Sequence, residues 1–312
     1  MTAVAVVIPA HDEEALLPDC LASVAASLRQ AVDRGVVGRH LVVVVAHRCT
    51  DATAEVAGRI LTGVPHRVVV DDRADIVSQV RRAGVDMALR LLGGRTDQLW
   101  LLSTDADSVV PARWVADLMR HGRDGAAAIA GLAHIEPADL PPAARAAYRR
   151  LVRAGIHGRS HEHVYGANLA VRADAYLRAG GFPLVDVGED SALVRVLAAS
   201  GAHVIRPTDP AVTTSARLTG RARGGLADLL LDLTVAGSAS GSVSGPGAGP
   251  GAGSGAGSAA GSVAGSEAAS GRPVRAAAIA PAEIAPGPRL PVARTVISVP
   301  VWSAARGIGQ RG

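Results

Sequence analysis

The sequence contains no lysine, only two cysteines, and few aromatic residues, which make up 2% of its 312 positions. Because every basic side chain other than histidine is an arginine, these cations keep their charge at any physiological pH. Cys20 and Cys49 do not form a CxxC pair, which argues against a thiolate zinc site or a disulfide framework. The scarcity of aromatic rings removes the stacking surface typical of single-strand nucleic-acid binders, so we expect no nucleic-acid partner.

Long hydrophobic runs are also missing. No stretch offers about twenty strongly apolar residues, so we expect no transmembrane segment. The first apolar run, AVAVVI at 3–8, ends at Pro9 and the polar HDEE that follows, and no basic segment precedes it. A signal peptide would need both features. These observations predict a cytoplasmic protein and leave a peripheral contact with a membrane open.

Composition and charge change near residue 235. The formal net charge is +4, and residues 237–312 contain six arginines against two glutamates, so the whole surplus belongs to this segment. Residues 237–271 are almost entirely glycine, serine, alanine and proline, which cannot bury enough apolar surface to offset the entropy of ordering. We therefore predict a folded domain over 1–235 and a disordered Gly/Ala/Ser/Pro-rich tail over 236–312.

Short β-branched runs alternate with helical patterns in the first part of the chain. The runs AVAVVIP (3–9) and LVVVVA (41–46) contain no charged residue, as expected for strands buried on both faces. This alternation predicts an α/β fold with a doubly wound, mostly parallel sheet. We expect further strands at 67–70, 98–103, 126–135 and 167–171, and helices at 17–28, after Asp51, and at 75–92, 141–158, 173–179, 190–200 and 226–233.

Two carboxylates, Asp105 and Asp107, directly follow the strand expected at 98–103. Open α/β sheets bind ligands at this end of their strands. Carboxylate oxygens suit Mg²⁺ or Mn²⁺, which commonly bind substrate phosphates as well. The same residues are also typical of a solvated turn. Their place after the fourth strand favours a metal site for a substrate diphosphate.

A second acidic pair, Glu189 and Asp190, opens the helix expected at 190–200. A helix N-terminus stabilises the ionised form of a carboxylate, which suits a general base, although ordinary helix capping gives the same pattern. The first loop, PAHDEE (9–14), contains no glycine. Its sequence therefore excludes a dinucleotide-binding GxGxxG turn and a P-loop.

Seven segments together resemble the family 2 glycosyltransferases, which have a single GT-A domain. They occur in the family's order: VVIPAHDEE (6–14), HRCTDAT (47–53), QVRRAG (79–84), TDADS (104–108), YGANLAVRADAYLRAGGFP (165–183), GEDSALVRVL (188–197) and TSARLTGRARGG (214–225). The resemblance implies a glycosyltransferase of the hexosyltransferase type. It would move a sugar from a nucleoside-diphosphate sugar to an acceptor hydroxyl, with inversion and with Mg²⁺ or Mn²⁺. The acceptor, a small molecule, a glycan or a lipid-linked compound, is left open.

The resemblance also implies roles for single residues. Asp190 is the expected catalytic base, and Asp105 and Asp107 are the expected metal ligands, Asp107 the more direct. Many members carry an aspartate where His47 stands, so the nucleotide base is left open. An arginine binds diphosphate oxygens in pairs, which suits Arg217. The expected contacts to the nucleotide sugar are Pro9, Ala10, His11, Glu13, His47, Arg81, Asp105, Glu189 and Arg217.

Two alternatives remain beside this interpretation. One is a retaining transferase on the same fold, of the glucosyl-3-phosphoglycerate synthase type. The other is a non-catalytic protein that binds sugar nucleotides or serves as a scaffold. The histidines at 157–163 suggest a zinc site, but their HEHVY spacing differs from HExxH. We therefore expect those histidines to be exposed or to contact the acceptor.

Overall fold

The computed structural model describes residues 1–135, 140–217 and 226–240. The expected tail begins at residue 236, so almost all of it lies outside the described residues, and its disorder stays a prediction. Most of the segment TSARLTGRARGG also lies outside them. No helix in the described ranges is both long enough and apolar enough to cross a membrane.

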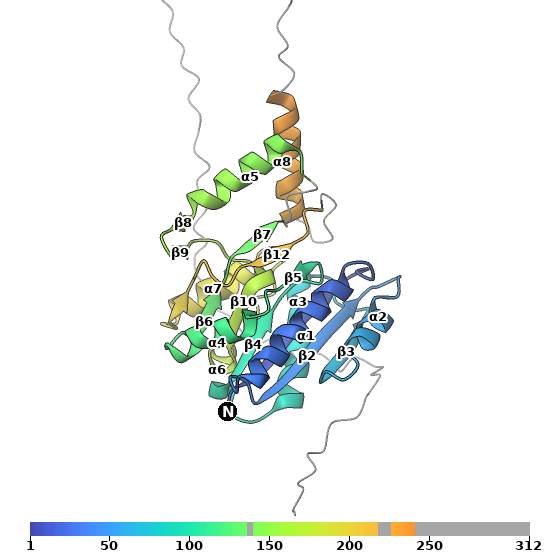
Figure 1. Cartoon of the computed structure of the whole chain (residues 1–312), viewed down its shortest axis with the longest axis vertical. Helices are drawn as coiled ribbons and strands as arrows, with labels where there is room; N and C mark the ends of the chain where they lie inside the picture. The colour runs from blue at the N-terminus through green and yellow to red at the C-terminus, as the bar shows by residue number, and fades with distance from the viewer. Residues whose placement is uncertain (136–139, 218–225, 241–312) are drawn as a thin grey trace, which may run out of the picture. The chain divides into compact units, whose positions relative to one another are not determined.

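A seven-stranded sheet forms the centre of the domain (Figure 1). Its order is β11-β6-β10-β4-β1-β2-β3, and all neighbours are parallel except β10, which is antiparallel to both β4 and β6. This confirms the predicted α/β fold with a mostly parallel sheet. The strands are β1 (Ala3–Ala10), β2 (Arg39–His47), β3 (His66–Asp71), β4 (Leu99–Ser103), β6 (Ala128–Ala130), β10 (Leu169–Arg172) and β11 (Val204–Ile205).

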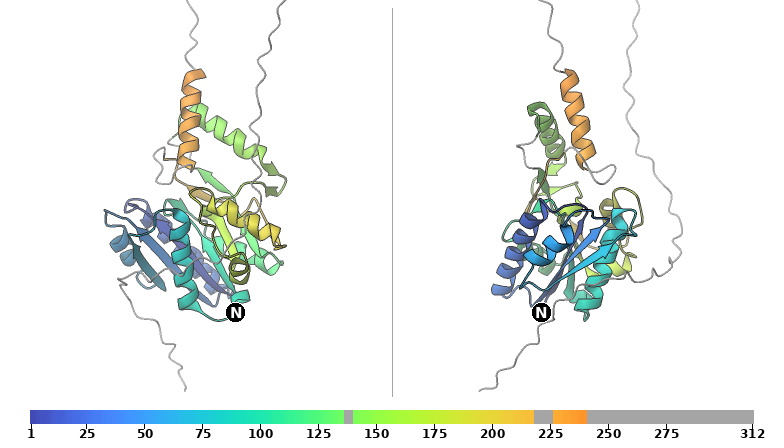
Figure 2. Two further views of the ribbon diagram at one scale, coloured as in Figure 1. Left: turned by 180° about the vertical axis from the view of Figure 1, so that it is seen from behind. Right: turned by 90° about the vertical axis from the view of Figure 1, so that its right-hand side faces the viewer.

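Helices cover both faces of this sheet, because alternate residues of its inner strands point to opposite sides. Val4, Val6 and Ile8 of β1 belong to a core shared with α1, α2 and α4, whereas Ala5 and Val7 belong to a core shared with α3, α6 and α7. In Figure 1 α1 lies on the near face, and the left view of Figure 2 shows α3 on the other. The helices are α1 (Leu17–Asp33), α2 (Thr53–Ile60), α3 (Val77–Leu92), α4 (Trp114–Arg123), α6 (Ala173–Arg178) and α7 (Glu189–Ala199).

The first helix shows how the sequence sets this packing. Leu17, Leu21, Val24 and Leu28 recur at helical spacing and are fully buried against the sheet. Burying one such side chain stabilises the fold by about 1.5–3 kcal/mol. Pro18 lies in the first turn, where its missing N–H leaves no helical hydrogen bond unmade.

A second sheet of three strands has the order β5-β12-β7. It consists of β5 (Ser108–Val109), β12 (Val212–Thr214) and β7 (Ala133–Ile135). The single strand predicted at 126–135 is therefore wrong, because β6 and β7 belong to different sheets. The physical reason is Asn168. Its side-chain N–H₂ donates to the Leu132 carbonyl at 2.9 Å, and its backbone carbonyl accepts from the N–H of Gly131 at 2.8 Å. These hydrogen bonds end the pairing of β6 with β10 before β7 begins.

Helix α5 (Pro142–Ala154) packs against α8 (Leu226–Ser240) through Tyr148, Val152 and Leu230. The helix predicted at 141–158 ends early because Gly158, at φ +62°, turns the chain into a hairpin of β8 (Ile156–His157) and β9 (Ser160–His161). Helix α8 continues to Ser240, beyond the predicted end at 233. Two 3₁₀ turns, η1 (Thr96–Gln98) and η3 (Gly166–Asn168), precede β4 and β10.

Candidate active site

The candidate site lies where the parallel strands end. Strand β1 pairs with β2 on one side and with β4 on the other, so the connections diverge at β1. Open α/β sheets bind ligands at such a switch point. Pro9 and Ala10 are the last residues of β1 and His47 is the last residue of β2. The loops that follow β1 and β4 carry His11, Glu13, Asp105 and Asp107, and Arg81 lies on α3. Two further segments, the start of α7 and the residues after β12, complete the set.

A buried arginine connects three of these segments. The guanidinium of Arg81, on α3, donates from Nε to Glu189 Oε1 at 3.0 Å and from Nη2 to Asp105 Oδ1 at 2.6 Å. Its third nitrogen donates to the Ser103 hydroxyl at the end of β4. Arg81 is only 3% exposed, and Gly166 leaves it room, because a Cβ there would lie 2.4 Å from Nη2. Burial lowers the pKa of Arg81, but the charges of Asp105 and Glu189 raise it by a larger amount, so the guanidinium is a fixed cation.

A second arginine connects the first loop to Asp107. Arg217 Nη1 donates to Glu13 Oε1 at 2.7 Å, and Nη2 lies 3.1 Å from Asp107 Oδ2. Thr214 donates its hydroxyl to the other Asp107 oxygen at 3.2 Å. The small sheet makes this contact possible, since β12 pairs with β5 directly after Asp107 and carries Arg217 three residues beyond its own end.

The carboxylates of this site outnumber its cations. Among the described residues, Glu13, Asp105, Asp107, Glu189 and Asp190 face two guanidinium groups, those of Arg81 and Arg217. Burial, followed by the charges of Asp105 and Glu13, raises the pKa of Asp107 to about 6 even though Arg217 lowers it. A divalent cation bound by oxygen ligands would remove this penalty, so the donor set fits Mg²⁺ or Mn²⁺.

Asp190 is the second residue of α7, beside Glu189. Its Oδ1 accepts from the N–H of Ser191 at 2.6 Å. Burial and the neighbouring Glu189 raise the pKa of Asp190, which the hydrogen bonds and Arg81 only partly oppose. The helix N-terminus therefore does not set the protonation of this group, contrary to the expectation from sequence. A carboxylate with a raised pKa is a stronger proton acceptor than an ordinary aspartate.

Two imidazole rings lie against each other, that of His11 in the loop after β1 and that of His47 at the end of β2. The rings of His11 and His47 stack with centroids 4.9 Å apart, and His11 Nδ1 lies 2.8 Å from the His47 carbonyl oxygen. Burial, and then the proximity of His11, lowers the pKa of His47 to about 4. His47 is thus neutral at physiological pH and presents a flat, uncharged ring where strand β2 ends.

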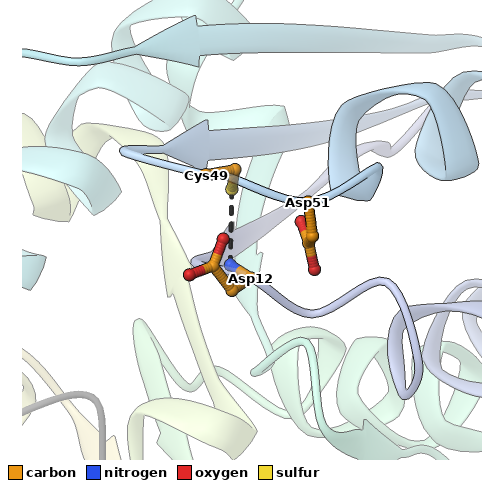
Figure 3. A group of neighbouring side chains, drawn as sticks. All are labelled: Asp12, Cys49 and Asp51. Carbon is orange, nitrogen blue, oxygen red and sulfur yellow. Dashed lines mark hydrogen bonds between the residues drawn. The ribbon is translucent and has the colours of Figure 1, made fainter.

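Three neighbouring side chains, Asp12, Cys49 and Asp51, connect the loop after β1 to the loop after β2 (Figure 3). The N–H of Asp12 donates to the sulfur of Cys49 at 3.4 Å. Asp12 Oδ1 accepts from the N–H of Thr50 at 2.6 Å, and Asp51 accepts from the N–H groups of Glu14 and Thr53, each at 3.0 Å. The two carboxylates thus accept hydrogen bonds from backbone N–H groups, and these bonds fix the conformation of the two loops.

The histidines at 157–163 bind protein groups. His161 Nε2 lies 3.1 Å from the Pro207 carbonyl oxygen and His163 Nε2 lies 2.8 Å from that of Val152, while His157 pairs with Glu162 at 3.2 Å.

Two site residues were not expected from sequence, Ser103 and Thr214. Thr214 belonged to a recognised segment, but only the register of β12 with β5 reveals its contact with Asp107.

The fold is the GT-A fold that is also found in nucleotide-sugar transferases of known structure. The mannosyltransferase PcManGT from Pyrobaculum calidifontis, solved with GDP-Man and Mn²⁺, is similar at a TM-score of 0.52 and 19% identity, over 78% of this chain and 76% of that one. S. aureus TarS 1-349 with UDP-GlcNAc is similar at a TM-score of 0.51 and 13% identity, over 75% and 66%. No family model and no curated protein sequence matches this chain.

Proposed function

We propose that this chain is a glycosyltransferase that moves a sugar from a nucleoside-diphosphate sugar to an acceptor hydroxyl, with inversion. One observation carries the proposal: five carboxylates and two arginines converge at the switch point of a GT-A fold. A pure binding module has no need of a carboxylate with a raised pKa beside such a cluster. The similar structures hold GDP-Man and UDP-GlcNAc, which agrees with a nucleotide-sugar donor.

The donor's diphosphate would lie over the acidic cluster. Asp107, together with Asp105, would hold Mg²⁺ or Mn²⁺, which supplies the positive charge that a diphosphate leaving group needs. Arg217 lies beside Asp107 and is 29% exposed in its side chain, so it can bind phosphate oxygens directly. Arg81 is buried with all three nitrogens engaged. We therefore assign Arg81 a positioning role, in which it orients Asp105 and Glu189, and its expected contact with the nucleotide stays untested.

The nucleotide base would lie near the stacked rings of His11 and His47, with the loop from Pro9 to Glu13 beneath the nucleoside. Asp190 would accept the proton of the acceptor hydroxyl. The oxygen of that hydroxyl would then form the new bond to the anomeric carbon while the bond to the diphosphate breaks on the opposite side. That geometry inverts the anomeric centre, and the raised pKa of Asp190 favours its part as the base.

A panel of nucleotide sugars tested by thermal shift, with and without Mn²⁺, checks the donor assignment. A ligand that binds only the native state raises the melting temperature, by an amount set by its concentration relative to Kd. We expect at least one uridine or guanosine diphosphosugar to stabilise the protein in the presence of Mn²⁺ and not with a chelator. Absence of any metal-dependent shift over the whole panel would contradict the proposal.

A further inference from the structure

A cavity of about 450 Å³ lies outside the candidate site and takes no part in the chemistry proposed above. One wall is helix α5 and the other is formed by β7 and β12. Thr213 lines the cavity, and the next residue, Thr214, donates to Asp107. The volume falls in the range of small-molecule pockets. The cavity is therefore large enough for a ligand. Because consecutive residues of a strand point to opposite faces, β12 separates the cavity from the acidic cluster.

Two kinds of side chain line this cavity in adjacent rows. Arg145, Arg149 and Arg153 recur every four residues along α5 and therefore share one face of the helix. Tyr148 and Val152, each one residue before an arginine of this row, contribute apolar groups, and Ile156 adds another from β8. Ile135 closes the apolar side from β7. The lining thus combines an apolar floor with a row of guanidinium groups.

The arginine row has no acidic counterpart in the described residues. Helix α5 contains no aspartate or glutamate, no carboxylate lines the cavity, and the ion pairs found in the described part of the chain include none of the three arginines. Like charges four residues apart on a helix repel, so the row is unfavourable on its own. A bound anion would relieve that repulsion.

We propose that this cavity binds an anionic amphiphile, whose phosphate or carboxylate group lies on the arginine row and whose aliphatic part lies on the apolar floor. Guanidinium groups bind such anions through paired, charge-assisted hydrogen bonds. The chain's own segment from 241 to 312 is a poor occupant, because it carries six arginines against two glutamates. The cavity does not depend on the proposed transferase reaction, since none of the residues that line it is assigned a part in that reaction.

Titration calorimetry of the full chain with decyl phosphate, below the concentration at which it forms micelles and without any nucleotide sugar, tests this site. We expect saturable binding of one molecule. Methyl phosphate, which lacks the chain, and decanol, which lacks the charge, should each bind at least about tenfold more weakly. Equal binding of methyl phosphate and decyl phosphate would overturn the proposal, because the apolar floor would then contribute nothing.

Substitutions locate the ligand. Arg149→Gln combined with Arg153→Gln should weaken decyl phosphate binding about tenfold or more, since each guanidinium supplies charge-assisted hydrogen bonds. Arg150→Gln is the matched control: Arg150 is exposed on the same helix but does not line the cavity. Ile156→Ser tests the apolar floor and should also weaken binding. If the arginine pair and the Arg150 control bind decyl phosphate alike, the ligand does not lie on the arginine row and the assignment is wrong.

Discussion

At the scale of single residues, two arginines form ion pairs with four carboxylates at the end of the sheet, and a fifth carboxylate, Asp190, is the neighbour of Glu189 in the chain. Burial and the acidic neighbours of Asp107 raise its pKa to about 6. A group in this state binds a metal well, because the ion replaces a proton that the site would otherwise take up.

Asp107→Ala should abolish the Mn²⁺ dependence of nucleotide-sugar binding and leave the domain folded. The side chain is removed from a loop after β4, where it packs against no core cluster. Thermal shift with the donor, with and without Mn²⁺, measures the effect, and circular dichroism checks the fold. A variant whose donor binding still responds to Mn²⁺ would show that Asp107 is not the main ligand.

Asp190→Asn should lower the rate of sugar transfer roughly 10²–10⁴-fold and leave donor binding unchanged, because asparagine keeps the size but cannot accept the proton. With wild type, the rate should fall as the pH drops through the raised pKa of Asp190, since the protonated carboxyl is no base. That acid limb therefore lies above the ordinary value of 3.8. Release of the nucleoside diphosphate, with water or an added alcohol as acceptor, is a suitable measurement.

Glu189→Gln is the companion variant, because Glu189 is bound to Arg81 and is the neighbouring carboxylate. It should weaken the positioning of the site while keeping a measurable rate. An inactive Glu189→Gln beside an active Asp190→Asn would reassign the base to Glu189. Full activity in both variants would favour the retaining alternative, which needs no base on the acceptor face.

His47 should stay neutral as the pH is lowered to 5. Burial and His11 depress its pKa to about 4, below the value of about 6.5 for a free imidazole. The unfolded chain therefore takes up a proton before the folded one does, and the free energy of unfolding should decrease as the pH falls from about 6.5 to about 4. Proton NMR of the ring titration, assigned with His47→Gln, gives the pKa directly. A midpoint near 6.5 would show that the ring is not buried.

At the scale of elements, the close packing of α3 on the sheet depends on Gly84, which has no side chain. A Cβ at Gly84 would lie 2.4 Å from Val7 Cγ1 and 3.0 Å from Val45 Cγ2. This approach brings α3, and with it Arg81, near enough to Asp105 and Glu189 to form its two ion pairs.

Gly84→Ala should destabilise the protein by about 1–3 kcal/mol, as overpacking of a core does. Gly58→Ala is the matched control: Gly58 lies inside α2, and a Cβ there meets nothing within 4 Å. Alanine favours the helix, so this variant should gain about 0.5–1 kcal/mol. Urea unfolding of both variants gives the comparison. A Gly84→Ala variant as stable as wild type would mean that α3 can move away from the sheet at no cost.

Sequence patterns predicted those elements whose burial is periodic or continuous. The runs that became β1 and β2, and the leucine spacing of α1, are local signals. The two-residue strands β5 and β11 have no such signal, because pairing with distant strands defines them. Strands β8 and β9 pair with each other in a hairpin and are too short to show an alternating pattern. The same limit applies to the site. Asp105, Asp107 and Asp190 could be selected from their places at element ends, whereas the ion pair of Arg217 with Asp107 depends on long-range register.

At the scale of the whole molecule, we expect the described domain to be independent of the segment that follows Ser240. Truncation after Ser240 should change the melting temperature by less than about 2 °C, because glycine, serine and alanine offer little apolar area to bury. The cut is placed after 240 and not after 235 because α8 continues to that residue. Differential scanning calorimetry of both chains tests this. A decrease of several degrees would place the domain boundary further along the chain.

The release of nucleoside diphosphate from a panel of nucleotide sugars by the full chain tests the central claim most directly. With Mn²⁺ or Mg²⁺ present, we predict that at least one donor is turned over and that a chelator stops the reaction. We also predict that Asp190→Asn lowers the rate of product release by roughly 10²-fold or more. Turnover of no donor with either metal, or turnover that neither the chelator nor the Asp190 substitution affects, would contradict the assignment of this chain as a metal-dependent glycosyltransferase.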